Sequence, residues 1–173
     1  MPFTPYHFGP SGFIGLAFRK WLDIPVFILA NAIVDMEVLV IVRLGLGYPI
    51  HRYLHTLLIG AAAGIGFALA AWPLRKVFKK IMRILSLPYQ TSLRKMVISG
   101  ILGVWFHVFI DAICHPDVHL FWPYKSILLW RLITKHQVES LCLAFFIPAL
   151  ILYLLTVILS RNKNKAEKNI QES

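Results

Sequence analysis

The sequence predicts an all-α membrane protein with four transmembrane helices, a short N-terminal re-entrant helix and an interfacial amphipathic helix. The composition, the mean hydropathy and the placement of the charged residues lead to this class. The 173-residue chain is 58% hydrophobic, only 15% of its residues are charged, and its mean hydropathy is +0.67. A soluble domain is typically about 45–50% apolar. The net charge is +10, and the basic residues lie between long apolar segments, which is typical of charge that faces lipid headgroups.

Four apolar segments are long enough to cross a bilayer, which takes about 20 residues each. They run over residues 24–46, 55–73, 95–114 and 139–159. The segment 10–20 is apolar but too short to cross, so we expect a re-entrant helix with Pro10 near its first turn. Residues 1–160 then form a single transmembrane domain, and the polar residues 161–173 form a disordered basic cytoplasmic tail.

The basic residues predict the orientation. Thirteen of the 18 lysines and arginines lie in residues 19–20, in the connection 74–95 or after residue 160, on one side of the four spans. That side is cytoplasmic by the positive-inside rule, so we expect a multi-pass protein of a bacterial inner membrane with a cytoplasmic C-terminus. In the connection, apolar residues at helical spacing predict an amphipathic helix on the inner leaflet that stops near Pro88; the alternative is a solvated basic connector.

Histidines and acidic residues gather at one depth of this arrangement. An ionisable group inside the hydrocarbon costs about 2.5–3.5 kcal/mol on insertion scales. Nevertheless, Asp35, Glu37, His107 and Asp111 fall within the predicted spans. Further residues of these types lie at the outer rim, namely His51, His55, His115, Asp117, His119, His136 and Glu139.

Spacing and depth predict that several of these side chains bind metal. His107 and Asp111 are four residues apart and share one helix face, where an imidazole and a carboxylate can grip one ion. At about 1.5 Å per residue, Asp35, His107 and His7 lie about 17–18 Å above the cytoplasmic ends of their helices. Asp111 and His55 lie about 24–27 Å above the cytoplasmic ends of their helices. Several carboxylates and neutral imidazoles in one slab need a cation, so we expect one or more divalent ions.

Taken singly, these residues leave alternatives open. A lone histidine in a membrane can simply bond to a neighbouring helix, and Arg43 or Arg52 could pair with an aspartate. Glu37 points about 200° away from the preceding acid around the helix and could face another element. His115 and His119 fall in the outer loop if the proline between them ends the third span.

Three segments resemble a known family. The opening MPFTPYHFGPSG, HRYLHT (residues 51–56) and HVFIDAICHPDVHLFWPY (residues 107–124) are similar to the YdjM-type family of LexA-regulated or related inner-membrane proteins, which are described as metal-dependent hydrolases. The resemblance implies these metal ligands: His7, Asp35, His51, His55, His107 and Asp111. The family commonly spaces its second motif His-Arg-x3-His, whereas this chain has His-Arg-x2-His, which leaves open whether His51 or His55 is the ligand.

A more distant likeness is to zinc-dependent phospholipase C. Those enzymes use His-x3-Asp/Glu ligands on helices, and His107-x3-Asp111 is similar, whereas His136-x2-Glu139 is one residue short. Their N-terminal tryptophan ligand has no counterpart here. The likeness implies phosphoester chemistry by analogy only.

We therefore expect a membrane-embedded metal-dependent hydrolase that acts on a phosphoester of a lipid or lipid-linked substrate, at a site toward the outer leaflet. The metal is expected to be zinc, with manganese or iron as alternatives. Asp35 and Asp111 would bridge the ions. Arg52 would neutralise phosphate charge, or else snorkel to the interface, and His136 or Glu139 would support a ligand or carry a proton.

Other classes of function remain open at this stage. The same His/Asp cluster suits a cation or proton transporter or channel. Imidazoles at residues 51 or 55 and 107 could hold a haem, and a structural subunit could use the polar residues to pair helices. A nucleic-acid partner is not expected, because the basic residues lack interleaved aromatic residues. The sequence contains no Gly-rich phosphate loop, no His-Glu-x-x-His and no Gly-x-Ser-x-Gly.

Overall fold

The computed structural model describes residues 4–171 of the chain and the side chains of residues 5–162. All regular elements in this range are helices. In chain order they are α1 (Thr4–Ala17), α2 (Ile24–Ile33), α3 (Asp35–Arg43), α4 (Leu57–Ala71), η1 (Trp72–Leu74), α5 (Arg75–Ile84), α6 (Leu93–Cys114), α7 (Lys135–Ala144) and α8 (Phe146–Gln171).

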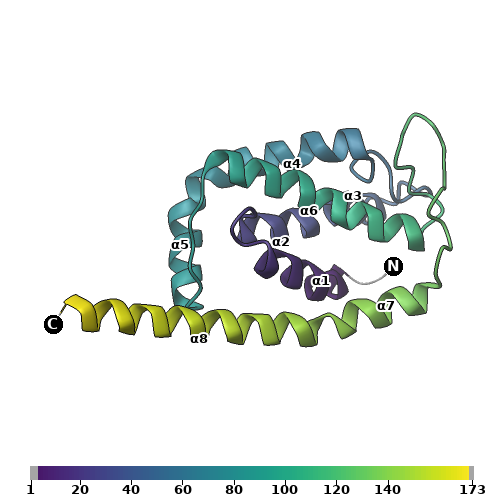
Figure 1. Cartoon of the computed structure of the whole chain (residues 1–173). Helices are drawn as coiled ribbons and strands as arrows, with labels where there is room; N and C mark the ends of the chain where they lie inside the picture. Colours follow the sequence, from purple (N-terminus) through teal and green to yellow (C-terminus); the bar gives the residue numbers. More distant parts are fainter. Residues whose placement is uncertain (1–3, 172–173) are drawn as a thin grey trace.

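The helices pack into one bundle with two different ends (Figure 1). α4 and α6 lie side by side, α2 packs against α6, and α1 lies between α2 and the long edge made by α7 and α8. α5 runs crosswise over one end, from α4 toward α8. We call this end, with the connections 18–23 and 85–92, the basic end. The opposite end, with the connections 44–56 and 115–134, is the histidine end.

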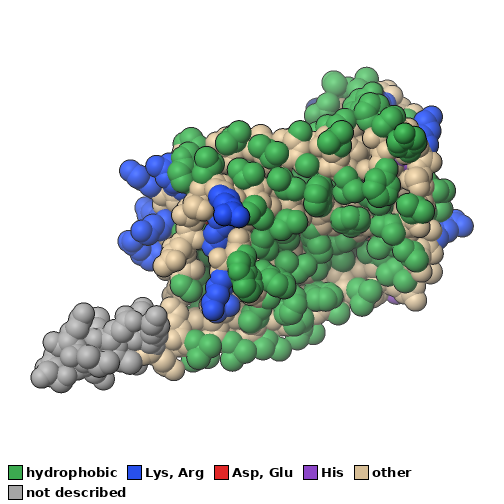
Figure 2. Space-filling model, turned by 45° about the horizontal axis from the view of Figure 1, so that its top comes forward, with side chains coloured by type: hydrophobic (Ala, Val, Ile, Leu, Met, Phe, Trp, Pro, Cys, Tyr) green, Lys and Arg blue, Asp and Glu red, His purple; other side chains and the backbone are tan. Residues whose placement is uncertain are grey.

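Four helical segments are long and apolar enough to cross a membrane, as the sequence predicts. They are Ile24–Arg43, Leu57–Ile84, Leu93–Cys114 and Lys135–Asn162. The first is interrupted at Val34, where α2 ends and α3 begins, and the last at Phe145, between α7 and α8. Figure 2 shows hydrophobic side chains over the middle of one face and lysines and arginines toward its ends, which is the distribution expected of a multi-pass membrane protein.

The N-terminal helix is longer than predicted. α1 begins at Thr4, so Pro10 lies inside the helix and not near its first turn. Proline removes one backbone hydrogen bond from a helix interior, but α1 packs against α2, α7 and α8, and this packing offsets the loss. The additional turns carry His7 into the bundle, where it is fully buried. The re-entrant placement of α1 in a membrane stays a prediction.

The two basic segments are both helical. α5 carries five lysines and arginines, and it buries Phe78 and Met82 against the bundle. Its position on a membrane surface stays a prediction. α8 continues to Gln171, so residues 161–171 extend an existing helix where the sequence predicts a disordered tail; extension needs no new helix nucleus. Residues 172–173 lie outside the described residues.

Glycines allow the central helices to approach closely. A Cβ on Gly64 of α4 would lie 2.6 Å from the carbonyl oxygen of Gly100 on α6, and a Cβ on Gly100 would collide with the carbonyl oxygen of Gly64. The small-residue face of α4 (Gly60, Gly64 and Ala68) is therefore a helix-packing face. This contact fixes the position of α6, the helix that carries His107 and Asp111.

Replacing Gly100 by alanine is expected to destabilise the protein by about 1–3 kcal/mol, the usual cost of overpacking, because the added methyl group meets backbone that cannot move aside. Gly66→Ala is the matched control on α4, since no atom lies within 4 Å of its Cβ position and alanine favours a helix. Thermal unfolding in detergent, followed by circular dichroism, measures both. Equal melting temperatures would contradict the close contact between α4 and α6.

Candidate metal centre

Six side chains predicted as metal ligands meet at the histidine end. They come from four parts of the chain that are far apart in sequence. α1 contributes His7, and α3 contributes its first residue, Asp35. The connection 44–56 contributes His51 and His55, and α6 contributes His107 and Asp111, which are one turn apart.

The carboxylate of Asp111 lies at the centre of this group. Its Oδ2 is 3.1 Å from Nε2 of His107, 3.7 Å from Nε2 of His51 and 3.8 Å from Nε2 of His55. Its Oδ1 is 3.7 Å from Nε2 of His7. Four imidazoles therefore direct the same ring nitrogen toward one carboxylate.

Asp35 also contacts the imidazoles of this cluster. Its Oδ1 lies 3.2 Å from Nε2 of His107 and 4.0 Å from Nε2 of His55. One ligand atom from each of Asp35, His55, His107 and Asp111 can be chosen so that all four lie within 4.8 Å of one another. Four potential ligands of the types that zinc prefers thus converge on one point.

Three of the imidazoles are oriented by an oxygen on their far side. Nδ1 of His55 lies 2.9 Å from Glu37 Oε2, and Nδ1 of His51 lies 3.0 Å from Asp117 Oδ1. Nδ1 of His107 lies 3.3 Å from Asn31 Oδ1 and 3.0 Å from Nδ1 of the fourth imidazole, that of His7. A proton on Nδ1 satisfies these oxygens and leaves Nε2 with a free lone pair, the arrangement typical of metal-bound histidine.

The converging nitrogens are buried but make no hydrogen bond. His7, His51, His55 and His107 are each at most 1% exposed, and Asp111 is 3% exposed. Within the described residues, all four Nε2 atoms and Oδ1 of Asp111 lack a hydrogen-bond partner. A buried polar atom without a partner costs about 1–3 kcal/mol, so five of them at one point need a further group.

A divalent ion fits the separations between these atoms. Ligands about 2.1 Å from one ion lie about 3.0 Å apart in an octahedron and about 3.4 Å apart in a tetrahedron. The separations between Nε2 atoms and carboxylate oxygens here run from 3.1 to 4.0 Å. A protonated imidazole would approach a carboxylate to about 2.7–2.9 Å, so most of these contacts are too long for direct ion pairs. The residues therefore fit a metal site.

A second group of possible ligands lies at the rim of the cluster and consists of His51, His115 and Asp117. The side chain of Asp117 accepts hydrogen bonds from the backbone amides of Ile50 and His51. Burial opposes its ionisation, but the bonds from the side chain and backbone of His51 outweigh burial and hold the pKa of Asp117 well below its usual value. Burial also lowers the pKa of His115 to about 4, which leaves a neutral imidazole at pH 7.

Glu37, whose role the sequence left open, holds the connection 44–56 in place. Its carboxylate accepts hydrogen bonds from the backbone amides of Arg52, Tyr53 and Leu54, at 2.8–3.1 Å, as well as from His55. The helical spacing correctly separates Glu37 from Asp35 around α3. The connection wraps around the end of α3, so both faces of the helix contribute to one site, and no local sequence signal reveals this.

The two connections of the histidine end are also tied to each other. The backbone amide of Leu57 donates to the carbonyl of Leu120 at 2.9 Å. Thr56 caps α4 by accepting from the amide of Ile59, and its hydroxyl donates to the carbonyl of Tyr53. These bonds fix the chain on both sides of His55 and limit its motion relative to α6.

The three residues predicted to assist catalysis lie outside the cluster. The guanidinium of Arg52 donates to backbone carbonyls of the connection 44–56. His136 is exposed on α7, and Glu139 forms an ion pair with Lys135 at 3.8 Å. Neither α7 residue belongs to the two groups of converging ligand atoms. The catalytic roles of Arg52, His136 and Glu139 stay predictions.

Comparison of the chain with protein-family models, with curated proteins and with solved structures found no match. A functional proposal therefore depends on the fold and on the geometry of the histidine end.

Replacing Glu37 by alanine is expected to destabilise the protein by about 1–3 kcal/mol or more, because three backbone amides and His55 lose their acceptor. Glu139→Ala is the control, since it removes only an ion pair at the surface and should cost less than about 1 kcal/mol. Unfolding in detergent, followed by circular dichroism, measures both variants. Similar losses for the two glutamates would contradict the role assigned to Glu37.

Proposed function

We propose that the histidine end holds one or more divalent metal ions, zinc first, and that the protein is a membrane-embedded metal-dependent hydrolase. One observation carries the proposal. The buried Nε2 atoms of His51, His55 and His107 lack a hydrogen-bond partner and face Asp111, while an oxygen holds each Nδ1. Structural histidines would use both ring nitrogens, whereas metal ligands present one nitrogen and anchor the other.

The proposed ligands form two groups that share Asp111. The carboxylates of Asp35 and Asp111, with His55 and His107, would hold a first ion. The carboxylate of Asp111 also faces His7 and His51, so that it would bridge to a second ion. On this arrangement both His51 and His55 would be ligands.

At this site a divalent ion would supply an activated water, since such ions lower the pKa of bound water to about 7, and a Lewis acid for a phosphoester oxygen. The chain's own residues orient the reactants. Glu37, Asp117 and Asn31 keep the imidazoles of His55, His51 and His107 in the ligating tautomer. Asp35 is the most exposed member of the first group, with its side chain 16% exposed.

A pocket beside the centre suits the polar head of a lipid phosphoester. It has a volume of about 460 Å³, and its lining includes His51, Asp117, Arg52, Lys125 and Trp122. The two cations would attract an anionic phosphate, and the aromatic side chains are typical of the membrane interface. The substrate class that follows is a lipid or lipid-linked phosphoester whose head enters through this pocket.

The remaining predictions agree with this proposal. The six ligands that the resemblance to YdjM-type proteins implies are the six residues that meet at the histidine end. The basic end, with α5, faces the cytoplasm by the positive-inside rule. The centre then lies toward the outer leaflet of a bacterial inner membrane, with the C-terminus in the cytoplasm.

The metal content of the purified protein tests the centre. Wild-type protein in detergent should contain near-stoichiometric zinc, manganese or iron by elemental mass spectrometry, and Asp111→Ala and His107→Ala should reduce it to background. His136→Ala should keep full metal content, because this imidazole is exposed on α7. Full metal content in a folded Asp111→Ala protein would overturn the centre as assigned.

Hydrolysis tests the activity separately. Metal-loaded protein should release product from a phospholipid or a prenyl phosphate reconstituted in vesicles, and Asp111→Ala or a chelator should abolish the release. The expected loss is at least about 10²-fold, since the nucleophile depends on the ion. Metal-dependent movement of cations or protons across the vesicles, without hydrolysis of these lipids, would replace the hydrolase by a transporter.

A further inference from the structure

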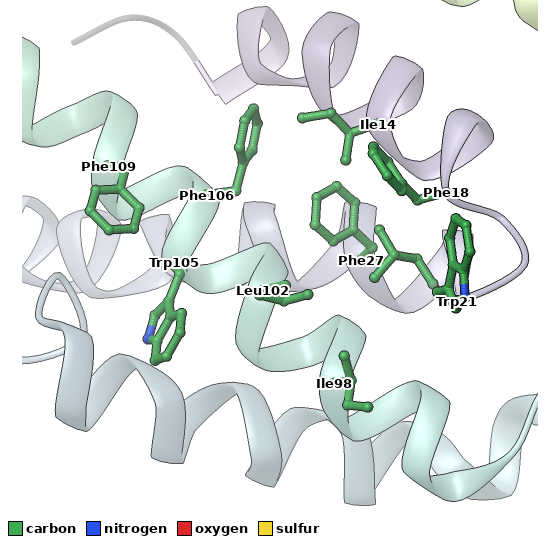
Figure 3. A pocket seen from close by; sticks show the side chains of 10 residues that line it. Ile14, Phe18, Trp21, Phe27, Ile98, Leu102, Trp105, Phe106 and Phe109 are labelled. Atoms are coloured by element: carbon green, nitrogen blue, oxygen red, sulfur yellow. The ribbon is translucent and has the colours of Figure 1, made fainter.

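A hydrophobic groove runs along the bundle between α1, α2 and α6. It has a volume of about 580 Å³, within the range of about 300–1,000 Å³ typical of ligand pockets. All ten side chains that line it are hydrophobic. Figure 3 shows Trp21 and Phe18 at one end, beside the loop that joins α1 to α2, and Phe109 at the other.

The length of this groove matches one leaflet of a bilayer. Ile98 and Phe109, which line it from α6, are separated by about 17 Å along the helix at 1.5 Å per residue. Half of the hydrocarbon core of a bilayer is about 15 Å thick. Because the flanking helices α2 and α6 belong to segments able to cross a membrane, the groove opens toward hydrocarbon, and a single lipid chain is the occupant that it fits.

A basic pocket adjoins the groove at the basic end. Its lining includes Arg19, Lys20 and Lys95 together with the connection 85–92. Within the part of the chain that the structure describes, none of these three cations has a carboxylate within ion-pair distance. Their positive charge is therefore available to an anion from outside the protein.

The residues that line the basic pocket and those that line the groove are neighbours along the chain. Arg19 and Lys20 of the pocket lie between Phe18 and Trp21 of the groove in the chain. Lys95 lies one helical turn before the groove residue Ile98 on α6. An anion in the pocket would thus stand at the mouth of the groove.

Lys95 is also held in a position suited to such an anion. Its ammonium group donates to the backbone carbonyls of Arg19 and Gln90, each at 2.8 Å. An ammonium group has three protons, so these two bonds fix the charge and leave one donor for a ligand.

We propose that this surface binds one anionic phospholipid, with its phosphate at Arg19, Lys20 and Lys95 and one acyl chain in the groove. The phosphate would lie at the basic end, whereas the groove reaches Phe109, between His107 and Asp111 on α6. The lipid site does not depend on the proposed hydrolase. Charge complementarity selects the headgroup, and the leaflet-length groove selects a lipid rather than a soluble phosphate.

Native mass spectrometry of delipidated protein, titrated with phosphatidylglycerol or phosphatidylcholine, tests the site. Phosphatidylglycerol should bind first and more tightly. Arg19→Gln/Lys20→Gln should weaken it by about thirtyfold, the loss expected when two cations are removed at a membrane surface. Leu102→Trp should weaken the binding of both lipids, because the larger side chain fills the groove.

Two matched variants serve as controls. Lys76→Gln/Lys80→Gln removes the same charge from the exposed face of α5, and Leu69→Trp adds the same ring on the exposed face of α4. Both should bind phosphatidylglycerol like the wild type, and circular dichroism should show equal helix content in all variants. Metal content, measured on the same samples, reports independently on the other end of the bundle.

Several outcomes would overturn the site. Equal losses in the Arg19/Lys20 and Lys76/Lys80 variants would mean attraction by overall charge alone. Glycerol phosphate that competes as well as the lipid would mean a soluble phosphate site. A dimer that forms as the lipid leaves would mean that a second copy of the chain covers the groove.

Discussion

The carboxylate of Asp111 is buried in the last turn of α6, a helix that is apolar enough to cross a membrane, and the histidine end is arranged around its charge. Removing a carboxylate from water costs several kcal/mol unless partners compensate for it. The ion pairs of Asp111 within the described residues are all with imidazoles, and those of Glu37 and Asp117 are as well. Neutral imidazoles cannot balance these charges, whereas added cations, either protons or metal ions, would.

The geometry favours metal ions over protons. Protonated imidazoles would draw the carboxylate into short bonds, whereas three of the four Nε2 atoms stay 3.7–3.8 Å from its oxygens. The far nitrogens of His51 and His55 already face carboxylates. These outer carboxylates raise the basicity of the rings as ligands, which is their usual role beside a metal.

Sequence reasoning could find the centre because its members are unusual in their setting. A histidine or aspartate in an apolar span stands out, and the rise of a helix places His7, Asp35 and His107 at one height without any knowledge of packing. The same reasoning could not assign Glu37 or Asp117, since their partners lie on irregular connections whose path depends on tertiary structure. It also began the predicted N-terminal helix near Pro10 and not at Thr4, because the packing that offsets an internal proline is not visible in local sequence.

The bundle separates its two polar ends by an apolar layer. Val26, Ala68, Met96 and Val104 are buried between them, and the buried polar residue Asp23 at the basic end is bound to the hydroxyls of Tyr89 and Thr91 and is closed off there. Among the described residues, no titratable side chain is buried in this layer.

The close packing of α6 against α4 and α2 explains how a metal centre at the histidine end could be rigid. The residues proposed as its ligands come from α1, α3, α6 and the connection 44–56, and small errors in the helix positions would separate them. At Gly64 and Gly100 the backbones of α4 and α6 touch directly, and at Gly103 α6 meets the backbone of α2. Contacts between backbones cannot relax by side-chain rotation, so they fix α6 relative to its neighbours more firmly than side-chain packing would. Closely packed small residues thus set the positions that the imidazoles around Asp111 require.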